Sequence, residues 1–382
     1  MSPNKLFILE PSKVATQHIT FLTGYLNALI DNRSINKKFS LVFEGSKSTV
    51  AALPRSVKDC VPTSTVWVMN PERRRLIRKS FLEFFVILFR IIKMKAGDAL
   101  IVTCALPPTV IMLEFANYLI RKRDVSLVLH GELEGLCKEE RESIKRIGYW
   151  AQLWAKLRPV RSRISLIVLD EFIKDRLYAL DNKKFSAKTV SVIPQPILAF
   201  QDDREAPSDE AHTVCFIGYR VQHKGFSTFR ELAKRHAELQ FVAIGGGLVE
   251  NVITGETKKL DGQQEYMAAI SNCVAALFPY ESGYSCSLSG AAVDALSAGV
   301  QVVAFNQPFF LNLEKVLGRD VVTVVQDRSE MSGWLSKAGG LAKTKQLAER
   351  RLAGILQSKY STESVGTAFE QLLADNRHEV EG

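Results

Sequence analysis

The chain of 382 residues is longer than most single domains and fits two of roughly 190 residues each. With 46% hydrophobic and 24% charged residues and no low-complexity tract, its composition excludes a disordered or fibrous chain. The net charge of +9 is uneven: residues 1–200 hold 32 Lys and Arg against 18 Asp and Glu, whereas residues 201–382 hold 18 against 23, so the first half predicts an anionic partner.

In the N-terminal half, apolar runs alternate with helical patterns. Residues 5–11 (KLFILEP) form the first predicted strand, and an amphipathic helix follows over residues 18–30. Further strands are predicted at residues 39–43, 99–104 and 126–129. This alternation predicts a parallel sheet with helices on its faces.

Two segments of this half are both basic and aromatic. In residues 70–95 an apolar core is broken by Glu83 and Arg90, so it falls short of the ~20 apolar residues of a spanning helix. A buried helix flanking the sheet is favoured for residues 84–92. Residues 141–163 place Trp154 and its neighbours at helical spacing among seven Lys and Arg. That pattern fits a helix in a membrane interface and fits core packing equally well.

The second half begins again after a polar stretch, residues 201–211 (QDDREAPSDEA), which has the composition of a linker. A second alternation of strands and helices follows. The strands are predicted at residues 212–219, 240–247, 275–280 and 300–305, and the first helix at residues 226–237. Both halves therefore predict an α/β, Rossmann-like domain, whose ligands bind at the carboxyl ends of the strands.

Two glycine-containing turns follow the first two strands of the second half. In FIGYRVQHKGF, Gly218 frees the turn, and Arg220 and Lys224 supply two cations that can neutralise a diphosphate. A solvated basic turn is the equal alternative. In AIGGGLVE, Gly246 lets a ligand approach the backbone, but the stretch lacks the third glycine of GxGxxG. A plain turn at the end of the strand is favoured for this segment alone.

The stretch SLSGAAVD opens a helix. Ser289 and Gly290 stand at its start, where free N–H groups and the positive end of the helix dipole can receive an anion. Ser289 also fits an N-cap, and the two interpretations are compatible. Asp294 lies one turn inside the helix, where it can accept a hydrogen bond from a sugar hydroxyl or serve as a surface acid.

Three segments in the same order, FIGYRVQHKGF, FVAIGGG and DALSAGVQVVAF, resemble the donor-binding domain of GT-B glycosyltransferases, most nearly glycosyltransferase family 4. In that family a Gly-Arg…Lys-Gly turn, a glycine strand exit and a Glu-Ala-x-x-x-Gly-x-Pro-Val-Val stretch bind a nucleotide sugar. The resemblance covers residues 164–305 well and the N-terminal half loosely. It implies two Rossmann-like domains facing across a cleft: an acceptor domain over residues 1–200, a donor domain over 201–360 and a C-terminal helix, 361–382, that packs back toward the first domain.

The sequence departs from the family pattern around these motifs. Tyr219 holds the place of the family's first arginine, so Arg220 comes one residue late. By spacing, Asp294 takes the position of the second family glutamate and Cys286 that of the first. Glu281 lies five residues too early, so only a longer or shifted loop would bring it to the donor.

In the N-terminal half the resemblance implies that His130, just after a strand, faces the transferred sugar. Glu132 and Glu134 follow directly, and either is a candidate general base if the reaction inverts the anomeric centre, with an ordinary solvated loop as the alternative for both. For Glu134 we favour an ordinary solvated loop. Lys13 and His18 flank the first strand–helix connection, where such enzymes meet the acceptor and the donor.

The resemblance implies a metal-independent glycosyltransferase, with a hexose as the expected sugar and no cofactor beyond a UDP- or GDP-linked donor. A glycan or lipid-linked acceptor of bacterial polysaccharide or glycolipid synthesis is expected. The basic N-terminal half favours a cytoplasmic enzyme at the inner face of the membrane, and no nucleic-acid partner is expected. The scattered cysteines predict mostly buried, reduced thiols, and the N-terminus does not predict a signal peptide.

Two other interpretations stay open. A nucleotide-sugar epimerase of the same fold would need neither an acceptor nor attraction to a membrane. A non-catalytic protein that binds anionic lipid or nucleic acid would leave the three ordered donor segments unexplained.

Overall fold

The computed structural model of the protein describes most of the chain. It covers residues 3–13, 18–68, 76–120, 123–137, 147–157, 164–180, 185, 190–200, 213–281, 284–338 and 345–381. The chain forms two compact units. Unit 1 comprises residues 1–196, Cys286–Leu288 and 362–382, and unit 2 comprises residues 197–285 and 289–361. The predicted linker, residues 201–211, lies outside the described residues.

Unit 1 is built on a seven-stranded parallel sheet in the order β3-β2-β1-β4-β5-β6-β7. Its strands are β1 (Asn4–Leu9), β2 (Phe39–Gly45), β3 (Thr63–Thr65), β4 (Ala99–Val102), β5 (Asp124–Val128), β6 (Ile164–Val168) and β7 (Val190–Val192). At the centre, Leu6 of β1 lies between Leu41 of β2 and Ala99 of β4. The central strands β4, β5 and β6 are mostly apolar and largely buried, as is typical of a parallel sheet covered by helices on both sides, whereas the edge strand β3 is exposed.

The helices of unit 1 follow the predicted alternation. They are α1 (Ile19–Asp31), α2 (Arg33–Lys38), α3 (Lys47–Ala52), α4 (Arg55–Cys60), α5 (Leu76–Lys93), α6 (Pro107–Ile120), α7 (Glu134–Cys137), α8 (Ile147–Lys156), α9 (Glu171–Ala179) and α16 (Thr362–Glu381), with a 3₁₀ turn, η1, at Gly131–Leu133.

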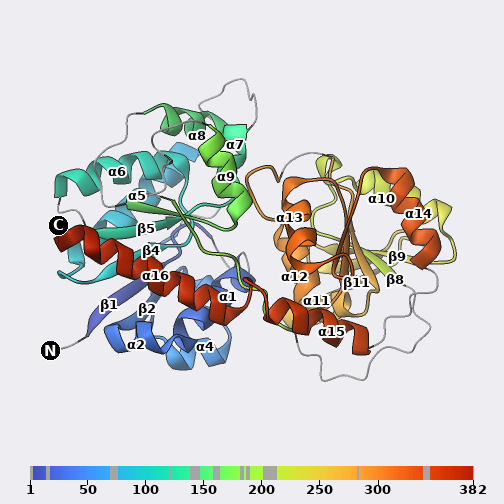
Figure 1. Ribbon diagram of the computed structural model, residues 1–382, viewed down its shortest axis with the longest axis horizontal. Coiled ribbons are helices and arrows are strands. Elements are labelled where there is room, and N and C mark those ends of the chain that lie inside the picture. The colour runs from blue at the N-terminus through green and yellow to red at the C-terminus, as the bar shows by residue number, and fades with distance from the viewer. Residues whose placement is uncertain are drawn as a thin grey trace. The chain divides into compact units, whose positions relative to one another are not determined.

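The C-terminal helix α16 packs within unit 1 and runs beside α1 (Figure 1). Val365 and Phe369 are fully buried in the core of the unit, where the Phe369 ring meets that of Tyr25 at 4.9 Å. A side chain at Gly366 would come within 2.7 Å of the Ala28 carbonyl oxygen. A glycine at this position therefore allows the two helices to approach closely.

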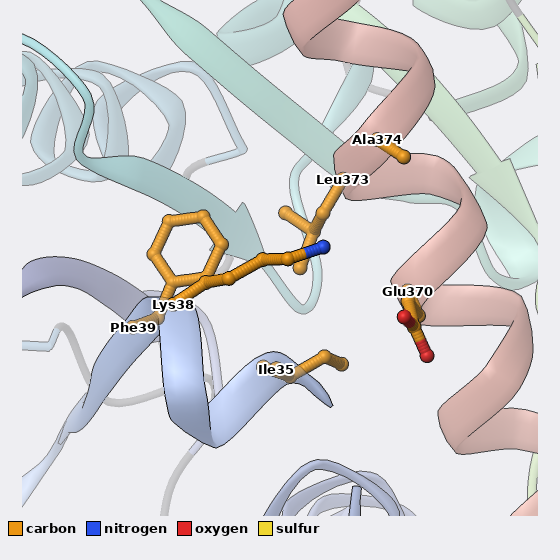
Figure 2. A pocket seen from close by; sticks show the side chains of 6 residues that line it. All are labelled: Ile35, Lys38, Phe39, Glu370, Leu373 and Ala374. Atoms are coloured by element: carbon orange, nitrogen blue, oxygen red, sulfur yellow. The ribbon is translucent and has the colours of Figure 1, made fainter. Parts of the chain in front are cut away.

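Farther along α16, the neighbouring α2 and the start of β2 leave a small hollow (Figure 2). It is lined by Ile35, Lys38, Phe39, Glu370, Leu373 and Ala374. Its volume of about 20 Å³ has room for about one water molecule, so it is too small for an organic ligand.

Helix α5 corrects the expectation of a buried helix over residues 84–92. Its inner face buries Glu83, Ile87 and Ile91, whereas Phe85 and Phe89 on the opposite face are each 58% exposed. The helical repeat places these phenylalanines away from the sheet, and no described element covers them. The expected helix beside the sheet is present, but only one of its faces is buried; the sequence did not show which, because the segment is apolar around most of its circumference.

Helix α8 uses its apolar spacing for the core. Ala151 and Trp154 are buried, and the Trp154 indole N–H donates to Glu114 Oε1 at 3.0 Å. Of the two interpretations that the sequence left open, core packing therefore describes this face. Ile147 at the start of α8 is the exception, because it is exposed.

Unit 2 contains a second seven-stranded sheet, ordered β11-β10-β9-β8-β12-β13-β14. Its strands are β8 (Thr213–Ile217), β9 (Gln240–Gly245), β10 (Leu248–Asn251), β11 (Thr257–Lys259), β12 (Ala275–Phe278), β13 (Gln301–Phe305) and β14 (Val322–Val325). Its helices are η2 (Gln222–Lys224, 3₁₀), α10 (Phe226–Arg235), α11 (Gly262–Ser271), α12 (Gly290–Ser297), α13 (Pro308–Leu317), α14 (Arg328–Ala338) and α15 (Lys345–Leu356). Helices α11, α12 and α13 cover one face of the sheet, and α10 and α14 cover the other (Figure 1).

Two strands at one edge of this sheet, β10 and β11, are antiparallel to their neighbours. Gly246 and Gly247, with φ of 64° and 78°, form the two-residue turn of the β9–β10 hairpin. Two consecutive positive φ angles match the turn type that two-residue hairpins prefer. The glycine run that the sequence analysis noted is therefore required by the hairpin.

A buried ion pair joins α5 to the sheet of unit 1. The Glu44 side chain, only 3% exposed, accepts from both Arg90 (Nε at 2.6 Å) and the Ser64 hydroxyl. The Arg90 guanidinium also lies 4.4 Å from the centre of the Phe7 ring. The arginine that interrupts the apolar segment is thus turned inward and neutralises a buried carboxylate.

We predict that Arg90→Met lowers the free energy of unfolding by about 3 kcal/mol, because it leaves the Glu44 carboxylate buried without its cation. The double variant Glu44→Gln/Arg90→Met should recover part of that loss. Urea unfolding at neutral pH measures both, with exposed Lys93→Met of the same helix as the control. A loss no larger than the control's would contradict a structural role for the pair.

Candidate functional site

The polar edge of unit 1 is formed by side chains at the carboxyl ends of three neighbouring strands. Glu10 follows β1, Thr103 follows β4 and His130 follows β5. In a parallel sheet these ends lie at one edge, where ligands of such folds bind. Glu132, in η1, completes this edge.

Glu10 is a buried carboxylate held by several donors. Its Oε1 accepts from the backbone N–H groups of Ser12 and Lys13 at 3.0 and 3.1 Å, and its Oε2 accepts from the Thr103 hydroxyl at 2.9 Å. Burial raises the pKa of Glu10, but His18 and these hydrogen bonds outweigh burial and leave the pKa lowered. Glu10 is therefore an anion at neutral pH.

Two histidines lie together above this carboxylate. His18 Nδ1 is 3.7 Å from Glu10 Oε2, and the rings of His18 and His130 are 4.8 Å apart. Phe21 of α1 packs edge-on against His130 at 4.7 Å. His18 has a left-handed backbone, with φ of 62°, at the residue before α1 begins. Such a conformation is costly for a residue with a Cβ, so the surroundings of His18 must hold it in place.

His130 is electrically neutral at physiological pH. Burial and the neighbouring His18 lower its pKa to about 4. Its Nε2 lies 2.8 Å from the Thr103 carbonyl oxygen, which can only accept, so the ring proton is on Nε2. The lone pair of the neutral ring is then on Nδ1, which can accept a hydrogen bond from a ligand hydroxyl.

Glu132 holds the backbone of this edge rather than standing free in a loop. One of its oxygens accepts from the His130 N–H at 2.9 Å, and the other accepts from the Cys104 thiol at 3.3 Å. Burial, followed by Glu132, raises the pKa of Cys104 well above its usual range, so the thiol keeps its proton and can donate it. Both oxygens of Glu132 are engaged, so service as a general base would require one of these bonds to open.

Glu134 corrects the expectation of a solvated loop residue. Its Oε1 accepts from the Cys286 N–H and the Ser287 hydroxyl, each at 2.8 Å, and Oε2 is buried with no partner among the described residues. The segment Cys286–Leu288 packs in unit 1 and is distant in sequence, which explains why local composition did not reveal the contact.

Lys13 is the cation of this edge. Electrostatic interactions with Cys104, Glu132, Glu10 and Glu83 raise its pKa against the opposing effect of burial. It therefore lies among the acidic groups and stays charged at neutral pH. The predicted residues Lys13, His18, His130 and Glu132 are thus brought together within unit 1.

The β8 turn, residues 218–225, carries the predicted cations of unit 2. Gly218 has φ of 114°, and a side chain there would come within 3.3 Å of Lys224 Nζ and within 4.0 Å of the Ala291 methyl group in the first turn of α12. The ammonium group of Lys224 therefore lies close to the start of α12. Arg220 points to a different partner, because its guanidinium pairs with Glu250 at 2.9 Å.

Close backbone contacts fix the β8 turn. A side chain at Gly225, whose φ is 69°, would overlap the Pro279 carbonyl oxygen at 1.8 Å. A side chain at Gly245 would come within 2.6 Å of the Gly218 carbonyl oxygen. Glycine is required at both positions, so the turn is set by its neighbours before any ligand arrives.

The start of α12 is capped as predicted. Ser289 accepts from the Ala292 N–H, and its hydroxyl also lies 3.1 Å from the hydroxyl of buried Tyr280. Lys224 Nζ is 5.6 Å from the centre of the Tyr280 ring. A side chain at Gly290 would meet no atom of the described residues within 4 Å, so among these residues the N-terminal face of the helix is open beside Lys224.

The two predicted acids of unit 2 differ in environment. Asp294 Oδ2 accepts from the Tyr266 hydroxyl at 3.0 Å, which joins α12 to α11. Burial, followed by Asp294, raises the pKa of Tyr266 well above its usual range, so the hydroxyl stays a donor. Glu281 is exposed, and its backbone N–H donates to the His223 carbonyl oxygen at 3.1 Å. Gly246 is in the β9–β10 hairpin described above.

Sequence reasoning missed several members of these edges. Glu10, Thr103 and Cys104 lie at the carboxyl ends of the strands predicted at residues 5–11 and 99–104, so the strand-end rule could have found them. Tyr280 likewise follows β12. The expectation of reduced cysteines was wrong for Cys286, which is disulfide-bonded. Among the described residues, Cys60, Cys104, Cys215 and Cys273 are not in disulfides.

Within the described ranges, no three His, Cys, Asp or Glu side chains are grouped so that they could share a metal ion. No described helix has both the length and the apolar character that crossing a bilayer requires.

Neither a protein-family model nor a curated protein matches the chain. Solved structures do match it. Sucrose-phosphate synthase from Thermosynechococcus elongatus is similar at a TM-score of 0.67 and 13% identity, over 98% of this chain and 100% of its own. HepE from Anabaena, solved with UDP, has a TM-score of 0.63 and 11% identity, over 97% and 99%. A glycosyltransferase from Rickettsia africae has a TM-score of 0.59 and 9% identity, over 98% and 99%. The chain therefore has the two-domain GT-B fold of glycosyltransferases, as predicted.

We predict that His130 makes the stability of the protein depend on pH in acid. Its pKa is about 4 when folded and roughly 6.5 when unfolded, so between these values the unfolded chain binds the additional proton. The free energy of unfolding should fall as the pH is lowered from 6.5 toward 4, and His130→Gln should lose part of that slope. Urea unfolding across this range measures it. The exposed His223→Gln should keep the wild-type slope, and an unchanged slope in His130→Gln would contradict the lowered pKa.

Proposed function

We propose that the protein is a glycosyltransferase that transfers a sugar from a nucleotide-diphosphate sugar to a glycan or lipid-linked acceptor. The observation that carries the proposal is the position of Lys224 next to Gly218 and the open, capped start of α12. An ammonium group beside free helix N–H groups is suited to a diphosphate. The GT-B neighbour HepE has been solved with UDP and with UDP-glucose, which supports a nucleotide sugar as the ligand.

Unit 2 would stabilise the leaving group. Cleavage at the anomeric carbon leaves negative charge on the nucleotide diphosphate while the sugar gains oxocarbenium character. Lys224 and the N–H groups at the start of α12 are fixed before the reaction, so they can stabilise that charge without reorganisation. We propose that this group acts without a metal ion, on a UDP- or GDP-linked hexose. Asp294, held by Tyr266, would bind a hydroxyl of the ribose or the sugar.

Unit 1 would supply His130 and the acceptor side. The neutral imidazole can accept a hydrogen bond from a sugar hydroxyl through Nδ1, because Thr103 already fixes Nε2 as the donor. We assign Glu132 the role of holding the His130 backbone. Lys13 and His18 would contact the acceptor. The basic charge of this half supports a lipid-linked acceptor at the cytoplasmic face of a membrane, in polysaccharide or glycolipid synthesis.

A panel of UDP-, GDP- and ADP-sugars tests the proposed donor by thermal shift. A ligand at a hundred times its Kd should stabilise the protein by about 2.7 kcal/mol and raise the Tm by several degrees. We expect at least one nucleotide sugar to do so, and the free sugar at the same concentration to have no effect. Absence of stabilisation by every member of the panel would refute the proposal.

We predict that Lys224→Ala weakens binding of the nucleotide diphosphate about tenfold, because a charge-assisted contact to phosphate is lost. Calorimetric titration with UDP or GDP measures the change. Lys234→Ala, in the exposed part of α10, removes the same charge from unit 2 away from the β8 turn and should bind as the wild type does. Equal affinities in the two variants would exclude Lys224 from the donor site.

A further inference from the structure

Helix α5 exposes a continuous apolar stripe, composed of Ile77, Phe81, Phe85, Phe89 and Ile92. The spacing of four, four, four and three residues places these side chains within about 120° of one face, along about four turns of helix. Three of them are more than half exposed: Phe85 and Phe89 at 58% and Ile92 at 59%. A single exposed apolar residue is ordinary on a protein surface. A row of five on one helix indicates a surface that a membrane or another molecule covers.

The stripe has a basic border. Arg78 at one end and Lys93 at the other are exposed, and Lys95, also exposed, lies two residues beyond the end of the helix. The only acidic residue of α5 is Glu83, which is buried on the opposite face. The Lys93 ammonium lies 4.0 Å from the centre of the Phe89 ring, so charge and apolar surface are adjacent. Any partner of this face must therefore accept aromatic side chains and carry negative charge.

We propose that the stripe of α5 is the surface by which the protein docks on an anionic lipid bilayer. A helix of 18 residues is about 27 Å long and can lie in the plane of the membrane, with its aromatic side chains in the acyl boundary and its cations at the head groups. This inference rests on the proposed function in one respect: docking on a membrane would bring the enzyme to the lipid-linked acceptor proposed above.

A second copy of the chain is a poorer occupant of this face. A symmetric pairing of two α5 helices would bring the same surface of each copy together. The basic border of one copy, Arg78 and Lys93 with Lys95, would then meet the same cations of the other, and the stripe offers no exposed carboxylate to neutralise them. A bilayer with anionic head groups satisfies both the charge and the apolar area.

Vesicle sedimentation of the full chain tests the proposal. We expect binding to vesicles of phosphatidylcholine containing about one-third phosphatidylglycerol, and weaker binding at high salt or without the anionic lipid. The variant Phe81→Ser/Phe85→Ser/Phe89→Ser should reduce the partition coefficient at least tenfold. Ile253→Ser/Leu311→Ser/Leu356→Ser removes three exposed apolar side chains from unit 2 and should bind as the wild type does.

Further measurements keep the outcomes distinct. Circular dichroism and thermal unfolding establish that both variants fold, and Lys93→Glu/Lys95→Glu provides a second test that leaves the aromatic residues in place. The proposal is overturned if the wild type ignores anionic vesicles, if the stripe variant binds as tightly as the control, or if sedimentation velocity shows a dimer that the stripe variant loses. Nucleotide-sugar binding is measured separately, without lipid. A protein that binds no nucleotide sugar could still bind vesicles, and a protein that binds no vesicles could still bind a nucleotide sugar, so the two proposals fail independently.

Discussion

One buried carboxylate organises the functional edge of unit 1. Glu10 leaves β1 and immediately accepts from the chain that follows it and from Thr103 at the end of the adjacent β4. Because an isolated buried charge would be very costly, these donors are obligatory, and they fix the ends of two strands together with the approach to α1. His18 is placed over this carboxylate, and His130 packs on His18, with its ring fixed by the Thr103 carbonyl. The positions of both histidines thus depend on a charge that a ligand need never touch.

Much of the fold could be predicted from sequence because it follows from local pattern. The strands β8, β12 and β13 and the helix α12 lie where apolar runs and a capping serine indicated them. The errors have different causes. The segment of α5 is apolar around most of its circumference, and part of its inward face is fixed by contacts distant in sequence, such as that of Arg90 with Glu44, 46 positions away. For the glycine run the sequence favours a plain turn at the end of the strand, and Gly246 and Gly247 do form a turn, but the antiparallel strand β10 that follows it was not predicted.

The candidate site divides in the same way. His130, Lys224 and Ser289 could be singled out because each stands at a strand or helix end with a residue type suited to a sugar or phosphate. The sequence does not show which of these candidate residues already form hydrogen bonds or ion pairs with other groups of the protein. Arg220 is paired with Glu250, and both oxygens of Glu132 are occupied, whereas Lys224 lies beside an open helix start. Such differences depend on partners that are distant in sequence or on another element. The order of the motifs therefore does not distinguish residues that are available to a ligand from residues that are already paired.

The place of α16 has a consequence for how the chain matures. The residues that complete the core of unit 1, Val365 and Phe369 among them, come after the whole of unit 2 in the sequence. During synthesis from the N-terminus, unit 2 can therefore close its core while α1 still exposes the apolar face that Phe369 will cover. Unit 1 is then the last to be finished, and until α16 arrives its open face is a natural site for a chaperone to bind.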